Sequence, residues 1–414
     1  MSQRVTDGRY VLHRILEIAE LDPGACARAL GISQQLFSEM LAGQREIPES
    51  MIPLVAAVVG VHESVLSSSE KDARSKDVVP AIWYKLRSGG LTESDREYVL
   101  ALRQLAYYYH ELEAVTETRS AGWKVLFEAV RTQTDPQASP SEQGRQAARI
   151  FRKQSGLDLG ARGIGEVFRG FLRNNGILLI ETPAPDSRLD GCSFYVGPSG
   201  AMRPCLLANS YRTTWFRRNR ILVHELAHAI FDVESAIASI DLIDEPSIDG
   251  VQESRADAFA QEALVPMEVL RHLSQQLSIN WKRIEPSKFA VLMAATHVEQ
   301  RLLSKALFEA QLVDGDSAQY LEQVDIAADL RRLTEHALST EEFMLQHREY
   351  SDAITKRATT TAPRKLLLPS RYVDAILRAM ESLTISRGKA ARMLMIERDE
   401  LEERFPLKDA ALAD

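Results

Sequence analysis

The residues with the clearest chemical potential are two histidines and a glutamate in the run His224-Glu225-Leu-Ala-His228. On a helix, residues four apart lie one turn above each other on the same face, so His224 and His228 can direct two imidazole nitrogens at one metal ion. Glu225 is offset around the helix beside that pair, where a carboxylate can accept a proton from water held by the metal. The spacing predicts a metal site with a general base next to it.

The segment around these residues is apolar on nearly every side, which predicts a buried helix. Two histidines and a glutamate in such a helix need polar partners. The alternative to a metal site is therefore a pair of hydrogen-bonded core histidines. The apolar positions are Ile221, Leu222, Val223, Leu226, Ala227, Ala229, Ile230 and Phe231.

A third metal ligand is expected from the segment 253–266, because a catalytic zinc usually takes three protein ligands and leaves one position for water. This segment reads as a helix with one apolar stripe, and Pro266 ends it. Glu253 and Asp257 lie four apart beside that stripe, so Glu253 is the candidate ligand and Asp257 is placed to hydrogen-bond a ligand histidine. Two alternatives stay open: Glu253 as a solvated first-turn carboxylate, and Glu262 as the ligand instead.

These two segments together resemble the ImmA/IrrE family of bacterial metallopeptidases. The resemblance covers about residues 150–270 and rests on His224-Glu225-x-x-His228 followed by Glu253-x-x-Ala-Asp257. It implies a zincin-like fold and a zinc ion held by His224, His228 and Glu253, with Glu225 as catalytic base and a repressor protein as substrate. Zinc is the expected metal and manganese the alternative. Ala227, where the family usually has glycine, and the run Trp215–Arg220 depart from the pattern without removing a ligand.

Bulk properties exclude several classes of protein. A length of 414 residues suggests about two to four domains, and a net charge of −8 argues against a protein that coats nucleic acid over its whole surface. The three cysteines, Cys26, Cys192 and Cys205, are expected to be reduced and packed. The N-terminus lacks the apolar core of a signal peptide, and no stretch approaches a membrane span, so we expect a cytoplasmic, soluble protein without a membrane partner.

Residues 8–65 read as a small helical bundle that resembles the Cro/repressor-type (XRE-like) helix-turn-helix domain. Two short helices, over 24–30 and 34–41, are joined through Gly31-Ile32-Ser33. In that geometry the second helix enters the DNA major groove. A protein-docking role is the alternative, because glutamates at 39, 46 and 49 surround the same face. The candidate DNA-contacting residues are Ser33, Gln34, Gln35 and Ser38, with Arg28 and Arg45 on the phosphate backbone.

The predicted fold class is mainly α with a small β-sheet (α+β): a zincin-like core flanked by helix-turn-helix-type modules. The predicted division is 1–65 (helix-turn-helix), 66–79 (linker), 80–131 (helical connector), 132–270 (metallopeptidase), 271–313 (helical or winged-helix-like) and 314–414 (C-terminal helices ending in a helix-turn-helix-like unit). Strands are expected over 177–181, 193–196 and 203–207, with a hairpin turn at Asp190-Gly191. The aromatic run Tyr107–Tyr109 is expected to pack against the catalytic unit.

Three functional interpretations follow. The first is a zinc metallo-endopeptidase that cleaves a repressor or antitoxin-like protein and is targeted or regulated by its N-terminal module, which would bind DNA. The second is a DNA-binding transcription regulator whose peptidase domain is inert or a sensor. The third is a toxin component neutralised by a partner. Homodimerisation is compatible with all three, and the arginines at 212, 217, 218 and 220 either pair with Glu234, Asp241 and Asp244 or attract an acidic substrate.

Overall fold

The computed structural model describes residues 12–17, 20–61, 63–66, 92–116, 121–157, 164–165, 167–184, 187–197, 201–211, 213–232, 239–242, 250–334 and 368–405. The predicted linker over 66–79, apart from Leu66, lies outside these residues, as does the start of the connector. The polar, threonine-rich stretch Thr355–Arg364, whose composition predicts a second linker, lies outside them too. The predicted fold class is confirmed, since in the described part of the chain helices dominate and one small sheet lies among them. No helix in the described part of the chain is long and apolar enough to cross a membrane.

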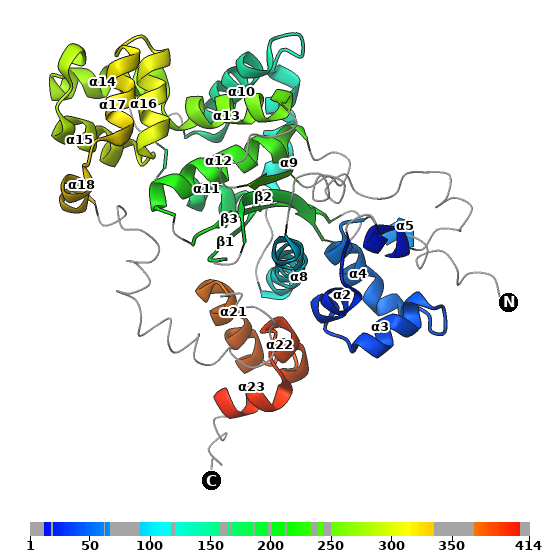
Figure 1. The fold of residues 1–414 in the computed structure, drawn as a ribbon. Coiled ribbons are helices and arrows are strands. Elements are labelled where there is room, and N and C mark those ends of the chain that lie inside the picture. The colour runs from blue at the N-terminus through cyan, green and yellow to red at the C-terminus, as the bar shows by residue number, and fades with distance from the viewer. Residues whose placement is uncertain are drawn as a thin grey trace.

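A four-stranded sheet lies at the centre of the molecule (Figure 1). Its strands stand in the order β1-β3-β2-β4, with β1 parallel to β3, and β2 antiparallel to both β3 and β4. The bounds are Leu178–Thr182 for β1, Leu189–Val196 for β2, Arg203–Asn209 for β3 and Ser239–Leu242 for β4. The three predicted strands are present, and β4 was not predicted.

The sheet separates two hydrophobic cores. On β3, Cys205 and Leu207 belong to the core shared with α8, whereas Leu206 and Ala208 belong to the core shared with α12. This follows from the alternation of side chains along a strand. Because both faces are buried, the strands read as nearly continuous apolar runs rather than as alternating ones.

The predicted hairpin turn at Asp190-Gly191 is wrong, because both residues lie inside β2. Gly191 pairs with Ala208 on β3 and with Asp241 on β4. A Cβ atom at Gly191 would come within 2.5 Å of Ile221 Cγ2 and 3.0 Å of Glu225 Oε1. The glycine is needed for the close approach of helix α12 to the strand rather than for a turn.

One face of the sheet is covered by the helices that carry and support the candidate site, as Figure 1 shows. Gly144 marks the closest approach of α10 to α13, since a Cβ there would lie 2.2 Å from the carbonyl oxygen of Arg255. Prolines and serines set the helix starts: Ser139 Oγ accepts from the backbone N–H of Glu142 ahead of α10. The helices are α9 (Gly122–Gln133), α10 (Pro140–Ser155), α11 (Phe168–Asn174), α12 (Trp215–Phe231) and α13 (Gly250–Leu264).

Helix α8 (Glu93–Thr116) packs on the other face of the sheet. It begins with a reciprocal cap: Asp95 N donates to Thr92 Oγ1 at 3.2 Å, and Thr92 N donates to Asp95 Oδ2 at 3.0 Å. Tyr107 and Tyr108 are buried, and the Tyr109 ring lies 5.2 Å from that of Tyr372. Tyr107 and Tyr108 belong to the core that includes strand residues of the predicted metallopeptidase region, as expected, whereas Tyr109 packs on Tyr372 near the C-terminus.

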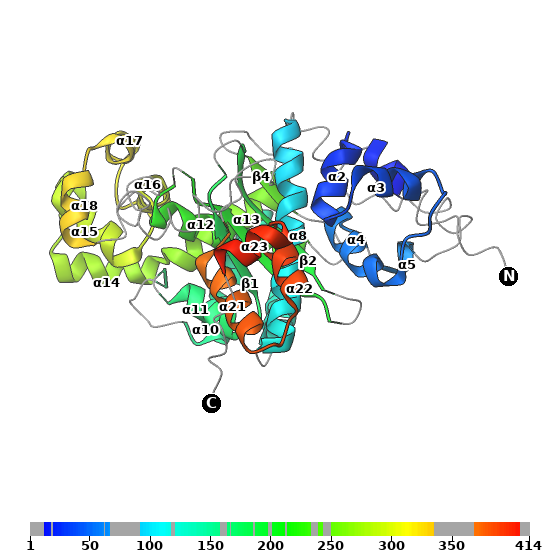
Figure 2. The same ribbon diagram turned by 90° about the horizontal axis from the view of Figure 1, so that it is seen from below.

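Two terminal helical bundles flank α8 (Figure 2). The N-terminal bundle contains α2 (Pro23–Leu30), α3 (Gln34–Leu41), the 3-10 turn Glu49–Met51, α4 (Ile52–Val59) and α5 (Glu63–Leu66); the C-terminal one contains α21 (Ser370–Glu381), α22 (Arg387–Met393) and α23 (Arg398–Arg404). Each is tied to α8 by an ion pair, Arg28–Glu97 at 2.9 Å and Lys389–Glu111 at 3.3 Å.

The two bundles repeat one local geometry. Helix α2 ends at Gly31, with φ 66°, and α22 is followed by Met395, with φ 56°. In both cases the left-handed residue lets the chain turn back and start the next helix, and the N–H that follows it bonds to a carbonyl five residues earlier. The short helices predicted at both ends of the chain are therefore present, with the same turn between them.

Between α13 and Thr334 the chain forms helices joined by turns. Every residue from 250 to 334 is described and no strand occurs between 267 and 334, so a β wing is missing from this part of the chain. The helices are α14 (Met267–Leu277), the 3-10 turn Trp281–Arg283, α15 (Pro286–Thr296), α16 (Gln300–Glu309), α17 (Gly315–Gln323) and α18 (Ala327–Leu333).

Candidate metal centre

Helix α12 carries the three motif residues in the interior of the protein. Its first turn is capped by Thr214, whose hydroxyl accepts from the backbone N–H of Arg217 at 3.2 Å. His224 is 3% exposed, and Glu225 and His228 are fully buried. The apolar neighbours along the sequence explain this burial, since α12 packs between the sheet and α13.

Arginines near the start of α12 fix its orientation. Arg217 Nη2 lies 3.0 Å from Asp190, Arg218 Nη1 lies 3.8 Å from Glu181, and Arg220 Nε lies 2.7 Å from Glu299. These acids differ from the three predicted partners, whose side chains lie outside the described residues, as does Arg212. The arginines thus bind the sheet and α15–α16 to the helix that holds the site.

His224, His228 and Glu253 converge on one point. His224 Nε2 lies 3.0 Å from His228 Nε2 and 3.1 Å from Glu253 Oε2, and His228 Nε2 lies 3.6 Å from the same carboxylate oxygen. A tetrahedron with bonds of about 2.0–2.1 Å to its centre has edges of about 3.3 Å, and the three distances lie within about 0.3 Å of that value. The donor set and its spacing fit a zinc ion held on three corners.

Each histidine is oriented by a carboxylate on its other nitrogen. His224 Nδ1 lies 3.2 Å from Asp257 Oδ1, the role predicted for Asp257. His228 Nδ1 lies 2.8 Å from Asp232 Oδ2, and Asp232 is in turn held by Arg255 of α13. Such contacts fix which imidazole nitrogen faces the metal. Asp232 was missed in the sequence, although its position four residues after His228 was a usable signal.

Hydrogen bonds within the cluster shift the pKa of His228 and that of Glu253 in opposite directions, and a metal ion that binds His228 must displace its proton. Burial alone lowers the pKa of His228, but hydrogen bonds to Asp232 and Glu253 outweigh it and raise this pKa to about 9. Burial raises the pKa of Glu253, and its hydrogen bonds to His224 and His228 reverse this and bring it well below its usual range. Glu253 is therefore ionised at neutral pH, the state in which a carboxylate binds metal.

Glu225 lies beside the cluster rather than in it. Its charge acts on His228, whose pKa it raises, and its Oε1 lies against the backbone of β2 at Gly191. The rival ligand Glu262 is placed elsewhere, because its Oε1 accepts a hydrogen bond from Arg149 Nε at 2.9 Å. The structure thus brings together the five predicted site residues, which are His224, Glu225, His228, Glu253 and Asp257.

The predicted DNA-contacting residues lie in the N-terminal bundle, well separated in sequence from the metal-site residues. Ser33, Gln34, Gln35 and Ser38 are exposed on α3 and the turn before it. Arg28 pairs with Glu97 of α8, and Arg45 Nε lies 3.2 Å from Glu39. Both arginines therefore already hold carboxylates of this chain.

A buried helix with His-Glu-x-x-His, a glutamate from a second helix and carboxylates behind both imidazoles is an arrangement compatible with a metallopeptidase centre. Residues 173–285 match a family model described as the IrrE N-terminal-like domain (Peptidase_M78). The matched segment contains all five residues, from His224 to Asp257, and supports a metallopeptidase of the ImmA/IrrE type. Comparisons with curated proteins and with solved structures gave no match.

Proposed function

We propose that this protein is a zinc-dependent metallo-endopeptidase that cleaves a repressor or antitoxin-like protein. The observation that carries the proposal is the triangle of His224 Nε2, His228 Nε2 and Glu253 Oε2, with sides of 3.0, 3.1 and 3.6 Å. Manganese remains the alternative metal. A cytoplasmic location belongs to the same proposal, because such substrates act on DNA.

In this proposal, His224, His228 and Glu253 bind the metal ion and Glu225 transfers the proton. When bound, zinc supplies Lewis-acid chemistry and lowers the pKa of water from 15.7 to about 7. Glu225 accepts the proton of the attacking water and passes it to the leaving amine of the cleaved peptide bond. Its burial excludes bulk water, which would otherwise compete for that proton. Asp257 and Asp232 keep both imidazoles turned toward the metal.

An extended substrate segment fits the architecture of the sheet. Strand β4 stands at one end of the strand order and pairs with β2, which packs on α12. A peptide added along such an edge gains backbone hydrogen bonds and lies across the helix that carries the site. The substrate would be a protein with a segment that can become extended.

The test is cleavage of a repressor encoded beside this protein, with wild type, Glu225→Gln and Glu262→Gln compared. Loss of the base should reduce the cleavage rate by at least about 100-fold. Glu262→Gln, a carboxylate removed from α13 outside the cluster, should cleave at nearly the wild-type rate. Cleavage that persists in Glu225→Gln would remove the role assigned to Glu225.

A targeting role for the N-terminal bundle accompanies the peptidase. The exposed polar residues Ser33, Gln34, Gln35 and Ser38 at the start of α3 favour a DNA contact of the helix-turn-helix kind. It would bring the peptidase to a DNA-bound repressor. A regulator with an inert peptidase domain predicts the same DNA binding without proteolysis, and the assay above separates the two.

A further inference from the structure

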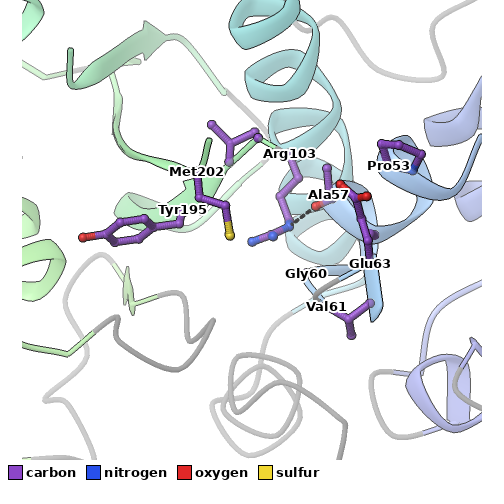
Figure 3. Close-up of a pocket in the computed structure, with 11 residues that line it drawn as sticks. Pro53, Ala57, Gly60, Val61, Glu63, Arg103, Tyr195 and Met202 are labelled. Atoms are coloured by element: carbon purple, nitrogen blue, oxygen red, sulfur yellow. Dashed lines mark hydrogen bonds between the residues drawn. The ribbon is translucent and has the colours of Figure 1, made fainter. Parts of the chain in front are cut away.

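A pocket lies where the N-terminal bundle, α8 and the β2–β3 connection meet. It has about 420 Å³ of empty space when the open solvent at its mouth is counted, of which only about 20 Å³ can take the centre of a water molecule. Its walls include Ala57 and Val61 from the bundle, Arg103 from α8, and Tyr195, Val196 and Met202 from the strands and their connection (Figure 3). None of these residues belongs to the proposed active site.

Arg103 is the chemically unusual member of this wall. It is 4% exposed, its Nε donates to the carbonyl oxygen of Ala57 at 2.7 Å, and its guanidinium carbon lies 4.6 Å from the centre of the Phe194 ring. Its Nη1 has no hydrogen-bond partner, and no described carboxylate lies within ion-pair distance of the guanidinium. A buried guanidinium that lacks a counter-charge is costly, so the site favours an anion.

The space around Arg103 is maintained by a glycine. Gly60 has a φ of 81°, and a Cβ atom there would lie 3.2 Å from both Cζ and Nη2 of Arg103. Glycine at this position allows the left-handed backbone that follows α4. Because it has no Cβ atom, it also leaves the Arg103 guanidinium uncovered. Figure 3 shows the guanidinium turned toward Met202 and Tyr195, with the Glu63 side chain on the other side of Ala57.

We propose that this pocket binds a small carboxylate ligand, with its charged end on the Arg103 guanidinium and its apolar end against Val61, Val196 and Met202. A planar guanidinium pairs with a carboxylate better than with a spherical ion, because two parallel N–H groups meet two oxygens. Apart from the Glu63 carboxylate, which also lines the pocket, the neighbouring walls are mostly apolar, and this favours a ligand with a short hydrocarbon part over inorganic phosphate.

Such a ligand would connect the N-terminal bundle to the peptidase sheet. Arg103 already joins the end of α4 to Phe194 of β2, and the ligand would add contacts to Val61 on one side and Met202 on the other. Occupancy would therefore stabilise the docked arrangement of the bundle on the sheet. This inference does not depend on peptidase activity.

The experiment is thermal unfolding of the full chain in acetate, propionate, chloride and phosphate at equal ionic strength. Acetate or propionate should raise Tm saturably by about 2 °C or more, and chloride and phosphate should not. Arg103→Met should abolish the rise. Arg96→Met is the matched control, because Arg96 also joins α8 to the N-terminal bundle, through Glu20, but does not line the pocket.

A second measurement covers the case in which Arg103→Met does not fold. In wild type labelled at the methionine methyl groups, propionate should shift the Met202 resonance saturably, and Glu63→Gln should bind it several-fold more tightly, since a nearby negative charge is removed. An unchanged Met202 resonance, or equal responses to chloride and propionate, would overturn the proposal. Loss of peptidase activity in Glu225→Gln bears on the metal centre alone and leaves this site untouched.

Discussion

His228 Nδ1 lies 2.8 Å from Oδ2 of Asp232, the residue at the C-terminal end of α12. Arg255 of α13 holds the other oxygen of the same carboxylate. One carboxylate thus links the second histidine of the motif to the helix that supplies Glu253. The arrangement of the site depends on this link as well as on the three metal-facing side chains.

Replacement of Asp232 by asparagine should weaken zinc binding about 10- to 100-fold, because the His228 ring loses the charge that orients it. Asp257→Asn should have a smaller effect, since the Asp257 side chain is 51% exposed and lies 3.2 Å from His224. Competition with a fluorescent zinc chelator measures both. Equal affinities in Asp232→Asn and wild type would contradict the role of Asp232.

Gly144→Ala should disturb the site from a distance. A Cβ atom would lie 2.2 Å from Arg255 O and 2.8 Å from Phe259 N, both backbone atoms that cannot turn aside. Helix α13, and Glu253 with it, must move, so we expect a loss of about 2 kcal/mol in stability and weaker zinc binding. Gly170→Ala is the control, since that position is exposed and nothing lies within 4 Å. A variant at Gly144 as stable as the control would show that α10 and α13 pack more loosely than described.

The candidate site was more predictable than its setting. His224, Glu225 and His228 follow from helical spacing alone, and Glu253 and Asp257 from a second amphipathic helix with the same four-residue spacing. Asp232 was not found, because an acid after a helix end has many ordinary explanations. Spacing within one helix can be read from the sequence, but contacts between the ends of different helices cannot.

Long-range contacts explain the remaining errors. Asp190-Gly191 has the composition of a turn, but the glycine is required by the passage of α12 across β2. Strand β4 has four residues, too few for an alternating pattern to be recognised. Similarly, nothing local indicated that Arg103 would lie buried between two parts of the chain.

The cysteine thiols should be inert in the folded protein. Burial raises the pKa of Cys26 and of Cys205 to about 12. Because only the thiolate reacts, its population stays small until the pH approaches that value, whereas an unfolded cysteine ionises near pH 8.5. Mass spectrometry should find neither residue alkylated by iodoacetamide at pH 8 without denaturant and both alkylated with it. Rapid native labelling would contradict the packing around β3 or α2.

DNA binding, if it resides in the N-terminal bundle, should depend on α3 and not on α23. The double variant Gln34→Ala, Gln35→Ala should bind promoter DNA at least about tenfold more weakly, because base contacts are lost. Arg398→Ala on α23 is the matched control, since the exposed surface there includes Glu397, Asp399 and Glu402, which repel phosphate. Fluorescence anisotropy at two salt concentrations measures the DNA affinity of both variants. Equal weakening in Arg398→Ala would contradict the assignment of the DNA contact to α3.

Metal content of the purified protein tests the central claim most directly. Elemental analysis should find about one zinc ion per chain in wild type and in Glu225→Gln, and much less in His224→Ala and Glu253→Ala, because only these last two remove a donor. Circular dichroism would show that the depleted variants are folded. Wild-type protein that binds no divalent metal, or Glu253→Ala that retains a full equivalent, would contradict the assignment of the centre.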